Sequence, residues 1–394
     1  MNTALAPIYL DNQATTPTDP RVVAAMLPWL GLEQVGNPHS EHTAGQRAAA
    51  AVERARAQVA ELIGADPSEI IFTSGATEAN NLAIQGVTRA PRRRGNHLVT
   101  AATEHKCVLE AFAYLRHTGA EAQLMPVMPS GLIDLDALRG ALRDDTALVS
   151  VMTANNEIGV VQPIAEIAAL CNARGIPFHT DAAQAAGKLP IDVKASGVDL
   201  LSVSGHKIYA PIGIGALYVS ADLELDLEPL IRGGSQERGL RPGTVPTFMC
   251  VAFGEACAIA SREMEQHRQH TLALREQFLG IIRSALPDAH VNGDLMQRLP
   301  SNLSLVFPGV DAEHLIGALQ PSIAISTGSA CTAGTLQPSH VLQALGLNAA
   351  AASGTVRIGF GRFNDAAQVA AAASEIARVA AAIRNGKSVR KTAA

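Results

Sequence analysis

Short apolar runs that alternate with helical patterns constrain the fold of this chain more than any other feature. Such alternation begins near Glu69 and is typical of crossover units on a largely parallel sheet covered by helices on both faces, because strands of that kind are buried throughout. The final two runs are joined without an obvious helix, which predicts one antiparallel strand. The predicted strands lie at residues 70–72, 97–100, 122–125, 147–151, 177–179, 200–203 and 214–219.

The rest of the chain predicts a second, smaller unit. A long, mostly helical stretch at residues 245–286 is followed by short apolar runs at 303–307, 323–325 and 355–358, and by a final helix with Asn364 as its N-cap. We therefore predict an α/β fold. A large domain with a mostly parallel, seven-stranded sheet would occupy residues 17–260. A smaller α+β domain would consist of residues 1–16 and 261–394.

Composition and charge narrow the class of function. The formal net charge of −5 argues against a protein that coats nucleic acid or an anionic membrane, and it favours small metabolites or protein partners. The five cysteines are scattered without CxxC spacing, so neither a disulfide framework nor a metal site is implied. No leader pattern and no apolar run of bilayer length is present, which predicts a cytoplasmic protein.

Two motifs carry groups that could react with an amino acid. Cys331 lies in a stretch of small residues at 328–332, and Lys207 follows a predicted strand. A thiol facing a cofactor-bound amino acid can take sulfur from it, and burial lowers the pKa of a lysine and favours imine formation. Either motif alone could be incidental. Together they point to pyridoxal 5′-phosphate (PLP), which needs a lysine, a ring-nitrogen carboxylate, a stacking partner, a phosphate cradle and a substrate-carboxylate clamp.

A phosphate cradle is predicted where the strand at 70–72 runs into a helix. The backbone N–H groups of Ala76 and Thr77, the Thr77 hydroxyl and the helix dipole could together seat an anion. A plain helix cap at Thr73 or Ser74 explains the same pattern without any ligand.

Polar residues at other predicted strand ends could meet the remaining needs. Asp181 could keep the ring nitrogen protonated, with Gln184 near the phenolic oxygen, although a helix N-cap is the plainer alternative for Asp181. His105 could stack on the ring and shuttle protons. Ser204 and His206 could complete the phosphate cradle. Either histidine could equally be structural.

Asn156 and Arg357 are the candidates for binding a substrate carboxylate. An arginine between apolar strand residues needs a partner, and its planar fork can grip both carboxylate oxygens. The glycine-rich stretch 233–244 is too long for a simple turn, so it is either functional or a flexible surface excursion.

Taken together, these motifs resemble the cysteine desulfurases of the NifS/IscS type, in the class V aminotransferase branch of the fold-type I PLP-dependent transferases. The resemblance is nearly full length and is carried by residues 9–17, 36–38, 74–78, 204–207, 326–332 and 357.

The resemblance implies a role for each candidate residue. Lys207 would be the Schiff-base lysine, His105 the stacking acid–base residue and Cys331 the sulfur acceptor. Thr244, from the glycine-rich stretch, would reach the phosphate of the neighbouring subunit, which implies a homodimer. The other cofactor contacts would be Ala76, Thr77, Asp181, Gln184, Ser204 and His206, and the substrate contacts Asn156 and Arg357.

The implied reaction converts L-cysteine to L-alanine, with sulfur passing to a Cys331 persulfide and on to an acceptor protein. That acceptor would be an iron–sulfur scaffold or a sulfur carrier, for iron–sulfur cluster or thio-cofactor biosynthesis. The chain ends soon after its last predicted helix, without the longer extension that housekeeping relatives use to dock a scaffold. The alternatives are a selenocysteine lyase, a PLP aminotransferase and a catalytically silent sulfur-relay or scaffold protein.

Overall fold

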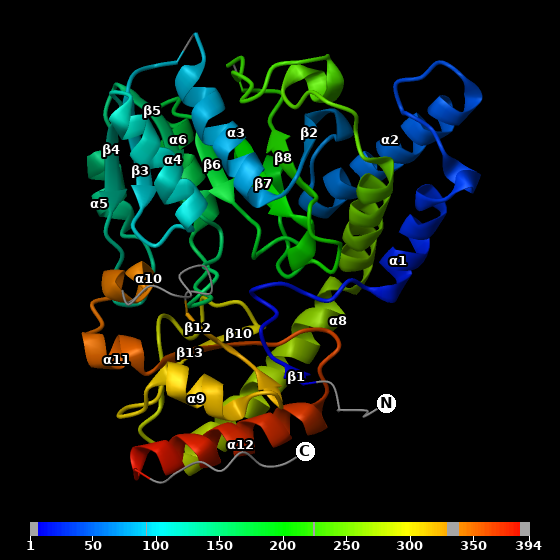
Figure 1. Cartoon of the computed structure of the whole chain (residues 1–394). Helices are drawn as coiled ribbons and strands as arrows, with labels where there is room; N and C mark the ends of the chain where they lie inside the picture. Colours follow the sequence, from blue (N-terminus) through cyan, green and yellow to red (C-terminus); the bar gives the residue numbers. More distant parts are fainter. Residues whose placement is uncertain (1–6, 92, 224, 329–338, 387–394) are drawn as a thin grey trace.

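A seven-stranded sheet is the largest feature of the protein. The structure is a computed structural model and describes residues 7–91, 93–223, 225–328 and 339–386. Every strand predicted for the large sheet is present in it (Figure 1). Its strands, in spatial order, are β2 (Ile70–Thr73), β8 (Gly215–Val219), β7 (Leu200–Ser204), β6 (Phe178–Asp181), β5 (Thr146–Ser150), β3 (His97–Ala101) and β4 (Glu121–Met125).

The strand directions bring most carboxyl ends to one edge of this sheet. β4, β3, β5, β6 and β7 pair in parallel, whereas β8 is antiparallel to both of its neighbours, β7 and β2. The prediction of one antiparallel strand is therefore confirmed. Because β2 and β7 both oppose β8, they run in the same direction, and the loops after β2, β3, β5, β6 and β7 share one edge.

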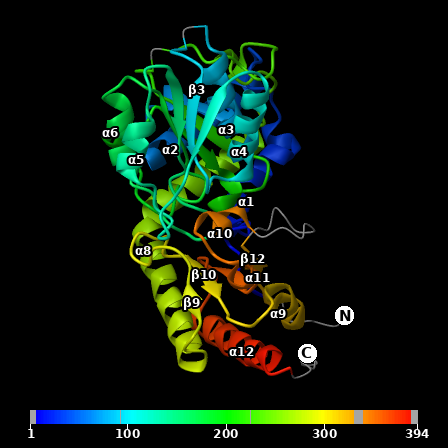
Figure 2. The same ribbon diagram turned by 90° about the vertical axis from the view of Figure 1, so that its left-hand side faces the viewer.

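Helices cover both faces of the sheet (Figure 2). Ile71 and Leu98 pack with α3 (Ala76–Arg89) and α4 (Lys106–His117). The alternate side chains of Phe72 and Val99 pack with α2 (Thr43–Ile63), α6 (Ile164–Asn172) and the first half of α8 (Thr247–Ala285). The shorter helices of this part are α1 (Pro20–Met26), α5 (Leu135–Ala141), α7 (Val193–Ser196) and the 3₁₀ helices η1 (Leu27–Leu30), η2 (Leu32–Gln34), η3 (Pro67–Glu69), η4 (Gly205–Lys207) and η5 (Gln236–Gly239).

A smaller antiparallel sheet has a hydrophobic core of its own. Leu303 and Leu305 of this sheet pack with Phe278 from the second half of α8 and with Ile376. These clusters agree with two structural units. The exact boundaries, 17–260 for the large domain and 1–16 with 261–394 for the small one, stay a prediction. The strands are β12 (Ser326–Thr327), β13 (Thr355–Gly359), β10 (Asn302–Val306) and β9 (His290–Val291), with α9 (Ala312–Leu319), α10 (His340–Ala344), α11 (Ala349–Ser353) and α12 (Ala366–Arg384); β1 (Ile8–Tyr9) pairs in parallel with β11 (Ile323–Ala324).

The last described helix, α12, begins one residue later than predicted. Asp365 is its N-cap and accepts from the Gln368 N–H, so the prediction of Asn364 as the cap is wrong. The Asn364 side chain instead accepts from the Gly361 N–H at 2.8 Å and donates to the Tyr9 carbonyl at 3.0 Å. Among the described helices, α12 alone is long and apolar enough by composition to span a membrane, but its apolar stripe packs into the smaller core.

Candidate active site

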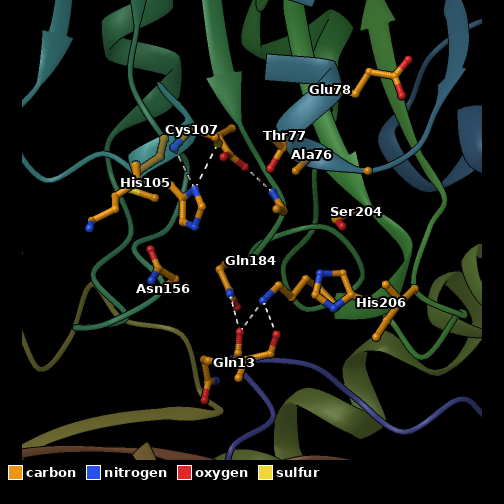
Figure 3. Close-up of a pocket in the computed structure, with 18 of the residues that line it drawn as sticks. Gln13, Ala76, Thr77, Glu78, His105, Cys107, Asn156, Gln184, Ser204 and His206 are labelled. Atoms are coloured by element: carbon orange, nitrogen blue, oxygen red, sulfur yellow. Dashed lines mark hydrogen bonds between the residues drawn. The ribbon is translucent and has the colours of Figure 1, made fainter. Parts of the chain in front are cut away.

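A pocket lies at the edge of the large sheet where β2, β3, β5, β6 and β7 end (Figure 3). Its wall combines the loops after these strands with Gln13 and Ala14 of the N-terminal segment and with His340 of α10. The predicted site residues that line it are Ala76, Thr77, His105, Asn156, Asp181, Gln184, Ser204, His206, Lys207 and Arg357. Residues from six separate segments are thus brought together, as the strand-end argument predicts.

Lys207 is held by backbone carbonyl groups from the N-terminal segment. Its Nζ donates to the carbonyl oxygen of Gln13 at 2.6 Å and to that of Ala14 at 2.7 Å. Lys207 ends η4, the short 3₁₀ helix that directly follows β7. The amine is therefore fixed at the pocket wall by two neutral acceptors.

The Asp181 carboxylate is buried and accepts a hydrogen bond on each oxygen. Asn80 Nδ2 lies 2.7 Å from Oδ2, and the Ala183 N–H lies 2.9 Å from Oδ1. The bond from Ala183 resembles a cap, but turns rather than a helix follow Asp181, so the N-cap alternative is wrong. Two donors on a buried carboxyl suit an anion at this position.

The N-terminus of α3 opens on the pocket without a side-chain cap. Gly75 is the N-cap residue, with φ at 148°, and no side chain of the described residues caps this helix. The alternative of a plain cap at Thr73 or Ser74 is therefore wrong. The first-turn N–H groups, including those of Ala76 and Thr77, meet the condition for an anion site at a helix N-terminus.

Ser204 and His206 stand on the strand and turn next to this helix end. Ser204 is buried, and its Oγ would lie 3.7 Å from a Cβ added at Gly75, so the two segments approach closely. Burial and the nearby charge of Lys207 lower the pKa of His206 to about 4. The imidazole is thus neutral at neutral pH, and its Nδ1 lies 3.0 Å from the Thr15 hydroxyl.

His105 has a structural role and also lines the pocket (Figure 3). It is the N-cap residue of α4, where its Nδ1 accepts from the Cys107 N–H at 3.2 Å. An acceptor at Nδ1 means that a neutral ring carries its proton on Nε2. The cap therefore fixes both the ring position and the tautomer.

Arg357 is buried on β13 and forms the partnership that its apolar flanks predict. Its Nη2 lies 2.8 Å from Asp11 Oδ1, and its Nη1 donates to the Asn156 carbonyl at 3.1 Å and to the Gly328 carbonyl at 3.4 Å. Its Nε has no partner among the described residues. The guanidinium is positioned by Asp11 and retains a donor for a ligand.

The glycine-rich stretch 233–244 is anchored to the large sheet. The buried Glu237 accepts from both terminal nitrogens of Arg56, at 2.7 and 2.8 Å, and from the Phe72 N–H at 2.7 Å. The alternative of a flexible surface excursion is therefore wrong for η5, where the anchoring Glu237 lies. Thr244 itself is exposed and lies outside the pocket of its own chain.

The cysteines fall into three groups. Cys171, Cys250 and Cys257 are fully buried, as predicted for small core residues, and burial raises the pKa of the Cys171 thiol to about 12. Cys107 stands in the first turn of α4 and lines the pocket. Cys331 lies outside the described residues.

Three residues that hydrogen-bond to predicted site residues were not predicted from the sequence: Asn80, Asp11 and Lys188. Asn80 follows Ala76 by four residues on α3, so helical periodicity from the predicted cradle could have found it. Lys188 follows its partner Gln184 by four residues, so the same spacing could have pointed to it. Asp11 has no such local signal, because it meets Arg357 only in the folded chain.

Comparison with known proteins agrees with this geometry. The family model described as Aminotransferase class-V matches residues 8–371. The human protein named cysteine desulfurase is 52% identical over 93% of this chain and 80% of its own length. Cysteine desulfurase IscS of Rickettsia rickettsii (strain Iowa) is 50% identical over 94% of this chain and 90% of its own length. A solved NifS-like protein superposes with a TM-score of 0.89 at 34% identity, over 95% of this chain and 99% of its own. The chain therefore belongs to the class-V aminotransferase family and, within it, to the cysteine desulfurases of the NifS/IscS type.

Proposed function

We propose that this enzyme is a PLP-dependent desulfurase that converts L-cysteine to L-alanine and transfers the sulfur to Cys331. One observation carries the proposal: a single pocket contains a lysine amine, a buried carboxylate and the uncapped N-terminus of a 14-residue helix. These groups suit the aldehyde, the ring nitrogen and the phosphate of one cofactor. The names of the relatives support the substrate, since they are called cysteine desulfurases.

The donor set fits PLP from end to end. The N–H groups of Ala76 and Thr77 and the hydroxyls of Thr77 and Ser204 would hold the phosphate, with His206 as a further donor. The twice-bonded Asp181 carboxylate would hold the protonated ring nitrogen, and the Gln184 amide would bind the phenolic oxygen. When bound, PLP supplies an electron sink for the bond that breaks at the α-carbon of the amino acid.

Two residues would move protons at the bound amino acid. Lys207 would hold the cofactor between turnovers, and its amine, once displaced by substrate, would act as a base at the α-carbon. The Gln13 and Ala14 carbonyls would keep that amine directed at the pocket. His105 would stack on the ring and exchange protons through Nε2.

The substrate carboxylate would be bound by Arg357, with Asn156 beside it. Asp11 holds one end of the guanidinium, so the fork is already oriented before a ligand arrives. The unpartnered Nε is the donor that a carboxylate would satisfy.

The chain on both sides of residues 329–338 lies against the pocket, which supports Cys331 as sulfur acceptor. Gly328 accepts from Arg357, and the Ser339 hydroxyl donates to Glu157, a pocket residue. Three residues span at most about 11 Å, so the chain is long enough for a thiol three positions beyond Gly328 to enter the pocket. The Cys331 thiolate would bond to the substrate sulfur, and the Cβ–S electron pair would stay on carbon, which takes up a proton to give alanine.

We also propose that the protein is a homodimer and that its persulfide passes to a separate acceptor protein, an iron–sulfur scaffold or a sulfur carrier. Leu27, Leu30, Leu32 and Val35 are large apolar side chains exposed within nine residues of each other, and Leu32 is 93% exposed. Exposed apolar clusters mark association surfaces. An exposed Thr244 outside its own pocket fits a role at the partner's phosphate.

One experiment tests the proposed activity. The purified protein, loaded with PLP, is incubated with L-cysteine, alanine is quantified, and extra sulfur is located by mass spectrometry. We expect equimolar alanine and a persulfide on the peptide that contains Cys331. Cys331→Ala should keep the visible absorption of bound PLP and lose sulfur release. An aminotransferase would be unaffected by that substitution, and extra sulfur on the Cys107 peptide in place of Cys331 would contradict the assignment.

A further inference from the structure

A buried lysine behind the pocket, Lys188, has no role in the chemistry described so far. Lys188 is 8% exposed. It lies in the turn-rich segment that follows β6 and also contains Gln184. In the described part of the chain no carboxylate forms an ion pair with it. Lysines are rarely buried without such a partner, because removing the ammonium from water is costly.

The amine of Lys188 instead bonds to the side chain of Gln184. Its Nζ donates to Gln184 Oε1 at 3.1 Å, and the other end of that amide, Nε2, donates to the Gln13 carbonyl at 2.9 Å. The same carbonyl accepts from Lys207 Nζ at 2.6 Å. A hydrogen-bonded path thus runs from Lys188 through Gln184 and Gln13 to Lys207, and Figure 3 shows its part at Gln184 and Gln13.

Lys188 and the Gln13 carbonyl together set which way the Gln184 amide points. In its protonated form the Lys188 amine only donates, so it stabilises Oε1 on its side and favours the NH2 group on the side of Gln13 and the pocket. The reversed amide would set its own N–H groups against those of the lysine. The Gln13 carbonyl, which only accepts, favours the same orientation from the other end of the amide, so without Lys188 one of the two groups that hold this orientation is lost.

We propose that Lys188 is a positioning residue, which fixes the Gln184 amide with its NH2 group toward the pocket so that it donates to the cofactor's phenolic oxygen. The inference rests on the proposed function, because it concerns the site of PLP on Lys207. The positive charges of Lys207 and Arg357 act on the Lys188 amine, and the charge of Lys188 acts in turn on the imidazoles of His206 and His267. Burial and the two cations lower the pKa of Lys188 to about 7.

Two substitutions at Lys188 separate the hydrogen bond from simple packing. Lys188→Met keeps the length of the side chain and removes the donor, whereas Lys188→Gln keeps a neutral donor. With PLP bound, we expect Lys188→Met to raise the midpoint of the pH titration of the visible Schiff-base absorption by roughly 0.5–1 pH unit, because the phenolic oxygen loses its donor and a nearby cation is removed. We expect kcat to fall about 3–10-fold with little change in KM, and Lys188→Gln to restore part of both effects.

Stability gives an independent readout. Because Lys188→Met removes a buried amine that lacks an anion, the unfolding free energy of the protein should not fall. Lys194→Met is the matched control, because neither Lys194 nor its partner Glu69 lines the pocket. It removes the 2.6 Å bond to the buried Glu69 and should lower stability while leaving the absorption titration unchanged.

The outcomes distinguish this inference from the proposed function. If the unsubstituted protein shows no visible absorption that depends on Lys207, the proposed function is wrong. If it does, and Lys188→Met titrates at the same pH as the unsubstituted protein, or loses stability without any spectral shift, then Lys188 is only structural and the inference is overturned.

Discussion

Replacing Asn80 tests how the pocket holds the Asp181 carboxylate. Asn80 is fully buried on α3, and its Nδ2 lies 2.7 Å from Asp181 Oδ2. We expect Asn80→Leu to weaken the binding of PLP, because the carboxylate that holds the ring nitrogen loses one of its two donors. A hydrogen bond to a charged group contributes about 1.5–3 kcal/mol. This corresponds to an increase in the Kd for PLP of about 10–150-fold.

The stability of the fold should change much less than the affinity. Asn80 Oδ1 has no hydrogen-bond partner in the described part of the chain, so leucine removes an unsatisfied buried acceptor together with the donor. Replacing polar groups by an apolar group of similar shape can be nearly neutral. We therefore expect the unfolding free energy of the apoprotein to change by no more than about 1 kcal/mol.

The measurement is an equilibrium titration of apoprotein with PLP, followed by absorption, beside urea unfolding of the same preparations. Asn81→Leu is the control, because Asn81 is the next residue on α3 and bonds to the Thr77 carbonyl rather than to Asp181. It should leave the Kd within about threefold, less than the loss of one hydrogen bond to a charge. The reasoning is refuted if Asn80→Leu binds PLP as tightly as the unsubstituted protein, or if its apoprotein stability falls as much as its affinity.

Three further predictions follow from buried and exposed groups. Glu237→Ala leaves the Arg56 guanidinium and the Phe72 N–H without their acceptor, so urea unfolding should show a loss of about 3–5 kcal/mol, and unchanged stability would contradict the anchoring of residues 233–244. Burial lowers the pKa of His179 from 6.5 to about 3. The buried neutral imidazole therefore contributes fully to stability above pH 6.5, and the unfolding free energy falls by about 1.4 kcal/mol per pH unit as the pH drops toward 3. Between pH 7 and pH 5, the unfolding free energy of His179→Gln should accordingly change less with pH than that of the unsubstituted protein. Leu32→Asp should convert a dimer to a monomer in sedimentation experiments, whereas a monomeric unsubstituted protein would rule out the proposed dimer.

The large sheet could be predicted because its central strands carry an unusually clear signal. β5 and β7 are buried at every position, and a strand without an exposed face reads as a continuous apolar run. β4 is less clear, since most of its side chains are exposed at the sheet edge. The start of α12 was predicted one residue early, because Asn364 and Asp365 are both good caps and only the contacts of Asn364 with Tyr9 and Gly361 decide between them.

The site residues that directly follow strands could be predicted from the sequence. The residues from distant segments that hydrogen-bond to them could be predicted less well. Asp181, Ser204 and Lys207 stand at strand ends, so topology alone gathers them. Their supporting contacts cross long stretches of chain: Asn80 reaches Asp181 over 101 residues, and Asp11 reaches Arg357 over 346. Helical periodicity can place Asn80 near the predicted cradle, but neither periodicity nor composition encodes the contacts themselves, because these depend on the packing of complete elements.

The unbroken helix α8 has a mechanical consequence. Its 39 residues correspond to about 58 Å of rigid rod, with one end embedded beneath the large sheet and the other beneath the small one. A hinge between the two cores would have to rupture consecutive turns of this rod. We therefore expect catalytic motion to be confined to loops around a stiff frame, and both cores to melt in a single cooperative event.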